Sequence, residues 1–550
     1  MKLRSVLLAL VPFILTLALV SCRSSDSNQE KNTAPLFKDL GNHHHTVTTN
    51  SEQAQRYFDQ GLTLLYGFNH AEAVRSFREA ARLDSTCAMA YWGVAYALGP
   101  NINMPMSDAA VPEAYAAAQK ALQLAPHARE TEQAYIQALA KRYSPEPLAD
   151  RKPLDQAYAD DMREVSQRYP GDLDAAALYA EALLDLSPWD YWTKDGQPKY
   201  RITEIISVLE SVLARDPNHI GANHFYIHAV EASQNPQKAE AAADRLLNLV
   251  PGAGHLVHMP AHIYLRVGRY NDASRANELA AQADESYITQ CRVQGFYAAA
   301  YYPHNIHFLW AAASMEGRSA VAINAARRLV ANAPLELLRQ YPFLEEILPT
   351  PYFALARFGK WDDLLREPQP PGGFLYTKGM WHYARGVAFA ASGKIDSAQV
   401  EQAQFQEIAQ NDSLKAASFW SGASAGSLLN IASHMLAAEL AEARGQKEEE
   451  ITQLKKAVEI QDQLPYMEPP PWYFPIRQAL GAALLDAGRA EEAAAVYKRD
   501  LKENPRNGWS LFGLEQSLRA QGKTAEADEV QKRFQEAWGL ADVTLRASIF

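Results

Sequence analysis

After residue 50, apolar residues recur at intervals of three and four, the spacing that places them on one face of an α-helix. Stretches in which every second residue is apolar, as in a half-buried strand, are few. The helical stretches are interrupted by a glycine, and an alanine follows shortly after it. The pattern predicts an all-α chain of helix pairs, each joined by a turn at its glycine. Clear copies of the unit are "GFNHAEAVRSFREAARLD", "GRYNDASRANELAAQAD", "GKIDSAQVEQAQ", "GRAEEAAAVYKRDLKENP" and "GKTAEADEVQKRF".

The unit recurs with a period near 34 residues, and several copies end in "DP" or "NP". Both features resemble the tetratricopeptide repeat (TPR), a pair of antiparallel helices. The resemblance implies a superhelical solenoid of about eleven to twelve repeats with inserted loops, in which each repeat packs on its neighbours. We expect an N-terminal array at 51–287, central repeats with insertions at 288–378 and a C-terminal array at 379–550.

Several turns of the predicted solenoid are lengthened by insertions. Loops of this kind often carry the specificity of a repeat protein, although insertions without function are equally compatible with the pattern. Three insertions lie at 99–112, 187–201 and 283–303, and two others, "REPQPPGGFLYTKG" and "YMEPPPWYFPIR", are rich in proline and aromatic residues.

The N-terminus has the composition of a secretory signal. Residues 1–21 combine two basic residues with an apolar run, and "LVSC" resembles the bacterial lipobox, so that Cys22 would be lipidated. A plain signal peptide or a membrane anchor is the alternative. The polar segment 22–50 is expected to be a flexible tether, in which His43-His44-His45 could bind metal loosely. Arg23 after the cysteine favours, by analogy, the outer membrane, with the protein facing the periplasm or the cell surface.

Charge and cysteine content exclude several classes of function. The formal net charge is −11 and no basic stripe occurs, so nucleic acid is an unexpected partner. Besides Cys22, the chain contains Cys87 and Cys291, which we expect to be free thiols in helices. The sequence also lacks a cysteine-based zinc motif, a glycine-rich phosphate loop, a nucleophile elbow and an HExxH motif.

The histidines follow the repeat register. His224 and His258 are 34 residues apart, and so are His228 and His262. With the turn glycine at position fifteen, positions two, five, nine and twelve lie on one face of the first helix, which lines the concave groove in TPR proteins. Glu181 occupies position nine of the preceding repeat. Eight residues of three successive first helices share this face: His224, His228, Glu231, His255, His258, His262, His304 and His307.

This face has the composition of a metal site. Neighbouring helices pack about 8–10 Å apart, so that side chains from two helices can reach one ion. Imidazole with one or two carboxylates favours zinc, copper, nickel or iron over calcium or magnesium. An open coordination position would permit hydrolysis by bound water. Two features speak against an ideal site, because Pro260 would kink the helix and the 283–303 insertion could rotate the next helix away.

Other interpretations of the same face remain open. It could be a groove for a protein, a peptide or a small molecule, a set of structural hydrogen bonds, or a pH-sensitive cluster. A clamp for a chain terminus would require Lys and Arg, and Arg266 is the nearest candidate. A late loop could face the histidines if the solenoid curls, and could supply a carboxylate or a guanidinium from Glu468, Trp472, Tyr473 and Arg477.

Taken together, several motifs resemble a group of exported bacterial TPR proteins, over about residues 45–540. The resemblance implies the fold and export, and no activity. The first hypothesis is therefore a membrane-anchored, extracytoplasmic scaffold that binds a protein or peptide, and the alternative is a metal-binding protein or metal-dependent hydrolase. The motifs include "GANHFYIHAVEAS", "HMPAHIYLRVGRY", "HNIHFLW" and "EPPPWYFPIRQALGAALL".

Overall fold

A computed structural model describes residues 34–291, 297–331, 333 and 335–550. Within these residues the chain is all-helical, and β-structure is limited to three isolated bridges. The N-terminal helices are α1 (Glu52–Tyr66), α2 (His70–Leu83), α3 (Ala88–Ala97), α4 (Val111–Leu124), α5 (Glu130–Ala140), α6 (Lys152–Arg168), α7 (Leu173–Asp185) and α8 (Ile202–Arg215).

The middle of the chain forms shorter helices around the predicted histidine face. They are α9 (Ile220–Val230), α10 (Glu240–Leu249), α11 (Gly254–His258), α12 (Pro260–Val267), α13 (Tyr270–Cys291), α14 (Tyr302–Met315), α15 (Ser319–Ala331), α16 (Leu335–Gln340), α17 (Thr350–Arg357) and α18 (Trp361–Arg366). The 283–303 insertion is largely helical, because α13 runs on to Cys291 and a π-helical turn, η4, covers Tyr297–Tyr301.

The C-terminal helices are α19 (Leu375–Ala391), α20 (Ile395–Ala409), α21 (Asp412–Ala416), α22 (Ala425–Ala443), α23 (Lys447–Gln461), α24 (Arg477–Asp486), α25 (Ala490–Glu503), α26 (Gly508–Ala520) and α27 (Thr524–Ala537). Short 3-10 turns are η1 (Asp108–Ala110), η2 (Ala125–His127), η3 (Pro236–Ala239) and η5 (Pro342–Ile347).

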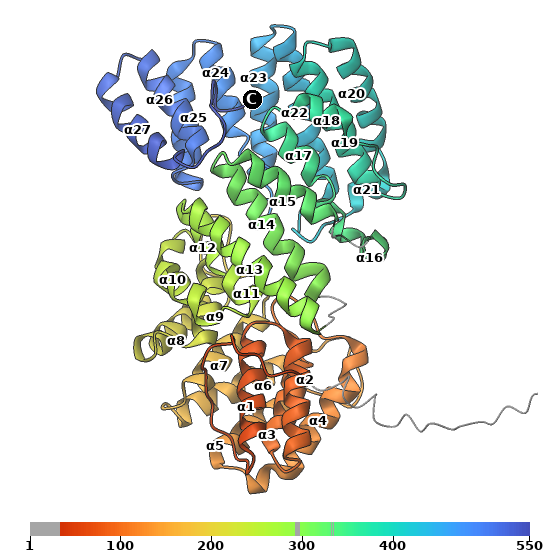
Figure 1. Ribbon diagram of the computed structural model, residues 1–550, viewed down its shortest axis with the longest axis vertical. Coiled ribbons are helices and arrows are strands. Elements are labelled where there is room, and N and C mark those ends of the chain that lie inside the picture. The colour runs from red at the N-terminus through yellow and green to blue at the C-terminus, as the bar shows by residue number, and fades with distance from the viewer. Residues whose placement is uncertain (1–33, 292–296, 332, 334) are drawn as a thin grey trace, which may run out of the picture.

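Consecutive helices pack as pairs, which lead from the N-terminal helices at the bottom of Figure 1 to the C-terminal pairs, α19 to α27, arranged across its top. Gly268 and Gly317 occupy the turns inside two pairs with φ of +78° and +74°, which side chains with a Cβ rarely adopt. The alanine five residues later, Ala273 or Ala322, is fully buried because it lies where the two helices approach closely. The predicted all-α TPR solenoid is thereby confirmed.

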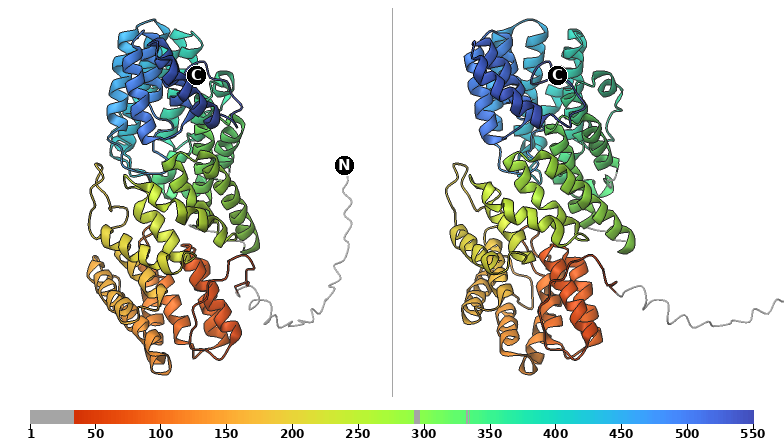
Figure 2. Two further views of the ribbon diagram at one scale, coloured as in Figure 1. Left: turned by 90° about the vertical axis from the view of Figure 1, so that its left-hand side faces the viewer. Right: turned by 60° about the vertical axis from the view of Figure 1, so that its left-hand side comes forward.

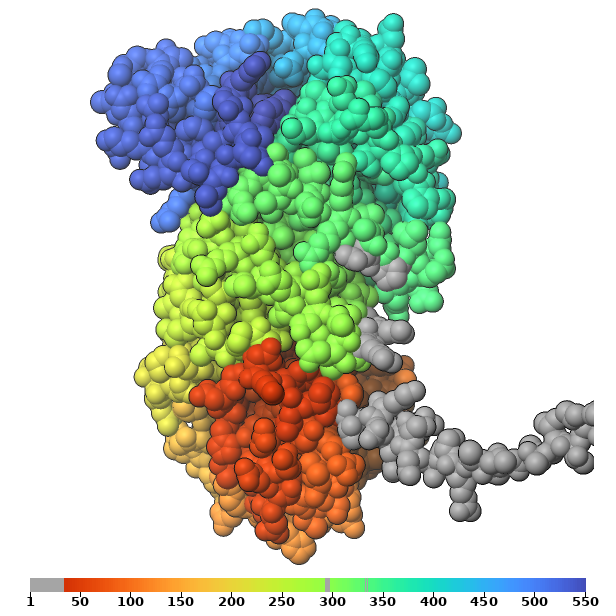
Figure 3. Space-filling model, in the orientation of Figure 1, coloured from red at the N-terminus to blue at the C-terminus, as the bar shows by residue number. Residues whose placement is uncertain are grey.

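The solenoid curls so that distant repeats touch. The indole nitrogen of Trp509 in α26 donates to the Ser314 carbonyl at 3.0 Å, and the Asp542 carboxylate accepts from the backbone of Ser319 at 2.7 Å. Gly268 lies against the Pro505 carbonyl. Both turned views place the C-terminal repeats (blue) directly against the central helices (green), and the two surfaces are continuous (Figures 2 and 3).

The segment from residue 34 to 50 packs on the solenoid, where a flexible tether was expected over 22–50. Tyr57 donates to the Ala34 carbonyl at 2.9 Å, and Thr48 is bonded to Glu132. The predicted signal peptide, Cys22 and the start of the predicted tether lie outside the described residues. Among the helices that the structure describes, none combines the length and the apolar character needed to cross a membrane.

Candidate metal centre

Four helices bring the predicted histidines together in the middle of the molecule (Figure 1). α9 carries two of them, α11 two, and α12 and α14 one each. The six side chains form two compact groups in which the nitrogens lie within 4.8 Å of one another. We name them the first triad, which is His224, His228 and His255, and the second triad, which is His258, His262 and His304.

The first triad is fully enclosed. The Nε2 atoms of His224 and His228 lie 3.0 Å apart, and both side chains are at most 1% exposed. His255 is 3% exposed, and neither of its ring nitrogens has a hydrogen-bond partner within the described part of the chain. Burying two nitrogens without partners lowers the stability of the folded chain unless a bound ligand interacts with them.

The second triad repeats this arrangement on the next pair of helices. The Nε2 atoms of His258 and His262 also lie 3.0 Å apart. The helix is interrupted at Pro260 as expected, since α11 ends at His258 and α12 begins at Pro260. Met259 between them keeps helical angles (φ −50°, ψ −37°), so His258 and His262 still face each other. His304 completes the group from α14, with its ring centroid 4.8 Å from that of His258, so the insertion does not turn it away.

Hydrogen bonds fix which nitrogen carries the proton in three of the rings, those of His224, His228 and His258. Nδ1 of His224 lies 2.5 Å from the Tyr66 carbonyl oxygen, and Nδ1 of His228 lies 2.8 Å from a Glu231 oxygen. Nδ1 of His258 lies 2.7 Å from Oδ1 of Asn277, whose amide nitrogen is bound to a backbone carbonyl. Because these oxygens only accept, Nδ1 donates in each case and Nε2 keeps its lone pair.

In the second pair, Glu231 and Glu468 favour a protonated His262 ring, whose Nε2 donates to Nε2 of His258. In the first pair, two lone pairs face each other across 3.0 Å. Such a contact between two acceptors is repulsive, and a bound cation would make it attractive. Two nitrogens that each bind one ion at about 2.0–2.1 Å lie roughly 3 Å apart, which is the spacing observed here. An Nδ1–H bound to a carboxylate or carbonyl is also the usual way in which proteins orient a metal-binding imidazole.

Two carboxylates lie between the triads and the outside of the solenoid. An oxygen of Glu231 lies 2.6 Å from Nδ1 of His262, and an oxygen of Glu468 lies 3.0 Å from the same nitrogen. Both side chains are at most 4% exposed. Glu468 comes from the loop before α24, so this loop faces the cluster as the sequence suggested. We call the two triads with Glu231 and Glu468 the histidine cluster.

Burial sets the protonation of the cluster. It lowers the pKa of five histidines, namely His224, His228, His255, His258 and His304, and neighbouring imidazoles add to the effect. Burial also acts to lower the pKa of His262, but Glu231 and Glu468 outweigh it and raise that pKa. Five rings are thus neutral at pH 7, which is the form that binds metal.

Each triad is covered by a phenylalanine. The Phe68 ring lies 4.6 Å from that of His224 and 5.6 Å from that of His255, measured between centroids. Phe308 lies 4.6 Å from both His258 and His262. These apolar rings exclude water from one side of each triad, which strengthens any interaction with a charge inside.

Two of the predicted insertions cover the cluster on one side. Trp189 of the 187–201 insertion meets the His228 ring edge-on at 5.3 Å and is 41% exposed. Tyr466 of the late loop is 39% exposed and lies against the Arg266 guanidinium. Lys194 donates to the Leu464 carbonyl at 3.4 Å, so the two insertions touch. The expected groove face is thus covered, since five histidines of the triads are buried and His304 is half-buried.

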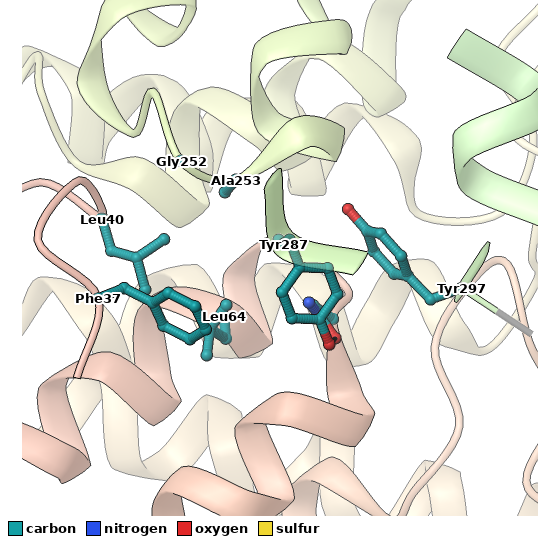
Figure 4. A pocket seen from close by; sticks show the side chains of 9 residues that line it. Phe37, Leu40, Leu64, Gly252, Ala253, Tyr287 and Tyr297 are labelled. Atoms are coloured by element: carbon teal, nitrogen blue, oxygen red, sulfur yellow. Dashed lines mark hydrogen bonds between the residues drawn. The ribbon is translucent and has the colours of Figure 1, made fainter. Parts of the chain in front are cut away.

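On its other side the cluster borders a small pocket between the N-terminal segment and α13 (Figure 4). Phe37 and Leu40 close this pocket against Tyr287 and Tyr297. The ring of Tyr297 contacts that of Tyr301 at 5.2 Å, and the Tyr301 ring lies 4.8 Å from that of His255. Residues 34–40 are therefore connected to the first triad indirectly, through ring contacts that run from Phe37 over Tyr287, Tyr297 and Tyr301 to His255.

Four predicted contributors lie elsewhere. His307 belongs to neither triad and stacks on Trp310 at 5.0 Å, because it lies three residues past His304 on α14. Glu181 accepts from the Tyr96 hydroxyl beside other repeats. Trp472 packs in the core against Phe353 and Tyr383, and Arg477 pairs with Asp462 and Glu503 near the surface.

Sequence reasoning missed the groups that orient the histidines. For Asn277 on α13, the only feature of the sequence that indicates an inward position is its spacing of four residues from the buried Ala273. Phe68 follows the first turn glycine, and its contact with α9 depends on how the first repeats curl. Aromatic or polar residues next to a turn glycine are a signal that could have identified Phe68 as an inward-facing residue.

No family model matches the chain, and no curated protein matches it either. Solved structures are similar at low identity. The yeast Tom70 structure matches at 11% identity with a TM-score of 0.28, over 90% of this chain and 92% of that one. The Cut9–Hcn1 complex matches at 12% and 0.29 over 89% and 78%, and human IFIT1 with m7Gppp-AAAA at 12% and 0.29 over 90% and 92%. These similarities concern the helical repeat fold.

Proposed function

We propose that this protein binds a transition metal in the histidine cluster. The observation that carries the proposal is the pair of triads, in each of which nitrogens of three histidines lie within 4.8 Å of one another and two Nε2 atoms lie 3.0 Å apart. Buried imidazoles oriented by carboxylate and carbonyl groups suit zinc, copper, nickel or iron. Three nitrogen ligands per triad leave a coordination position where water or a substrate can bind, so metal-dependent hydrolysis is chemistry that the centre allows.

The first experiment measures metal in the full chain, purified without a histidine tag or chelator. We expect at least one equivalent of metal, which the His228→Gln/His262→Gln double variant loses. The matched control is His44→Gln/His127→Gln, two exposed histidines outside the cluster. Metal well below one equivalent in the wild type, also after incubation with zinc or copper, contradicts the proposal.

Thermal unfolding gives an independent readout. A metal that binds only the folded chain stabilises it by about 2.7 kcal/mol when its free concentration is 100 times Kd. We expect zinc or copper to raise the Tm of the wild type and of the control variant, and to leave the Tm of the double variant unchanged. An unchanged Tm in the wild type counts against metal binding.

We propose that a protein or peptide partner binds the two contacting loops that cover the cluster, the 187–201 insertion and the loop before α24. The 187–201 insertion and the loop before α24 present exposed aromatic side chains there, Trp189 and Tyr466. Exposed aromatic residues on contacting loops are typical of interaction sites. This location gives the expected scaffold function a surface that also controls access to the metal.

We also propose that the protein is a lipoprotein of the cell envelope, on the strength of the lipobox-like "LVSC" in the sequence. Lipid on Cys22 would hold the solenoid on the outer membrane. Membrane fractionation of the Cys22→Ser variant tests this. Release of the variant into the soluble fraction is the expected outcome, and equal retention of both forms contradicts it.

A further inference from the structure

We propose that the histidine cluster is a dinuclear copper centre, with one ion in the first triad and one in the second. The inference rests on the proposed metal binding and adds the number and kind of ions. It follows from three features of the cluster: its internal duplication, the arrangement of its ligand atoms and its charge.

The two triads are built on one plan. In each, two histidines four residues apart on consecutive helical turns face each other through Nε2 at 3.0 Å. In each, the third histidine comes from the next helix of the stack, His255 from α11 or His304 from α14. In each, a phenylalanine lies against the three rings. Duplication of the whole arrangement produces two equivalent sites.

The two triads are separate groups of ligand atoms. In each triad the nitrogens of three rings lie within 4.8 Å of one another, which is close enough to hold one ion per triad. The Tyr66 carbonyl orients a ring of the first triad and Asn277 a ring of the second, while Glu231 contacts one ring of each. The triads are still adjacent, because the rings of His255 and His258 stack at 5.9 Å.

The donors favour copper. The ligands of both triads are imidazoles, while the carboxylates of Glu231 and Glu468 lie on the Nδ1 side of the rings that they contact. Imidazole nitrogen is a donor that suits copper. Glu231 and Glu468 supply two negative charges, and Arg266 next to Tyr466 supplies a positive one. Two monovalent copper ions therefore leave less uncompensated buried charge than two divalent ions, which reduces the cost of burial.

The test is an anaerobic titration of the full, untagged chain with Cu(I) against a chromogenic copper chelator. We expect two equivalents in the wild type and one in each of two variants, His224→Gln in the first triad and His304→Gln in the second. The matched control is His307→Gln, on the same helix as His304 and outside both triads, which should retain two equivalents. Circular dichroism checks that each variant is folded, and His228→Gln and His258→Gln replace any that is not.

The outcomes separate the two proposals. One equivalent in the wild type, abolished in both variants, overturns the dinuclear centre and leaves metal binding intact. Two equivalents of zinc without uptake of copper overturn the choice of metal. Wild-type protein that takes up neither copper nor zinc overturns the dinuclear centre together with the proposed function.

Discussion

At the scale of the residue, the cluster depends on atoms that bind no metal. Nε2 of His224, His228 and His258 is free to act as a ligand because Nδ1 of the same ring donates to an oxygen, supplied by Tyr66, Glu231 or Asn277. Loss of such an outer group commonly weakens metal binding, since the ring is no longer held in the required orientation and tautomer. The identity of these partners therefore matters as much as that of the histidines.

Asn277 offers a clean test, because its contact with the cluster is a single hydrogen bond to His258. The Asn277→Leu variant should lose about 10–100-fold in metal affinity at the second triad, measured by chelator competition. The Asn277→Asp variant keeps an acceptor oxygen and should retain affinity. Equal weakening by both substitutions would mean that packing, and not the hydrogen bond, is what Asn277 supplies.

At the scale of the element, the N-terminal segment is held by one buried carboxylate. Asp174 lies at the start of α7 and accepts from His43 and His45 of this segment, at 3.1 and 2.7 Å. His219 approaches the same carboxylate at 3.2 Å. His43 and His45, which belong to the expected tether, thus attach this segment to α7 through Asp174. We call these three residues the clasp.

This clasp should open as the pH rises. Burial acts to lower the pKa of His43 and His45, but Asp174 outweighs it and raises both above the usual 6.5 of a histidine. A group with a raised pKa in the folded state contributes stability that is complete below pH 6.5 and is lost as the pH rises through the folded pKa. Hydrogen exchange of residues 34–50 should therefore report weaker protection at pH 9 than at pH 6, beyond the intrinsic pH dependence of exchange.

The control for the clasp is its exposed neighbour. His44 pairs with Asp59 at the surface, so His44→Gln should keep the pH dependence of protection. The Asp174→Asn variant should lose it, because the carboxylate that stabilises the protonated histidines is gone. A pH dependence that survives in Asp174→Asn would show that another group controls the segment.

At the scale of the whole molecule, the curl of the solenoid assembles the site. The turn after α1 supplies the Tyr66 carbonyl and Phe68, and the loop before α24 supplies Glu468. Both segments lie far along the chain from the four helices that carry the histidines. The packing of the C-terminal repeats on the turn at Gly268, next to α12, holds the late loop in reach.

Two glycine substitutions isolate the contribution of this closure. A Cβ at Gly268 would lie 2.2 Å from the Pro505 carbonyl oxygen, whereas a Cβ at Gly445 would contact nothing within 4 Å. Both glycines have similar positive φ, of +78° and +70°, so the backbone strain of alanine is matched. Gly268→Ala should lower the free energy of unfolding by about 1 kcal/mol or more beyond Gly445→Ala, measured by denaturant titration. Equal losses of unfolding free energy in the two variants would show that the contact between Gly268 and Pro505 adapts to the added methyl group without cost.

The sequence by itself determined the helix pairs, the repeat register and the face that the histidines share. These follow from apolar spacing and turn glycines, which act within one or two helices, and six of the seven histidines predicted for this face lie in the two triads. The register did not identify which residues of this face join the cluster, because contacts with neighbouring side chains decide that. His307 stacks on Trp310, and Glu181 accepts a hydrogen bond from Tyr96 in another part of the core.

Only the tertiary structure decided which histidines meet, that they are buried, and that Glu468, Asn277 and the Tyr66 carbonyl complete the site. It also turned the end of the expected tether into a packed segment. The physical reason is that the curvature of a solenoid sums small rotations over many repeats. The side-chain pattern of one repeat specifies its own packing, and the contacts between distant repeats depend on all the repeats between them.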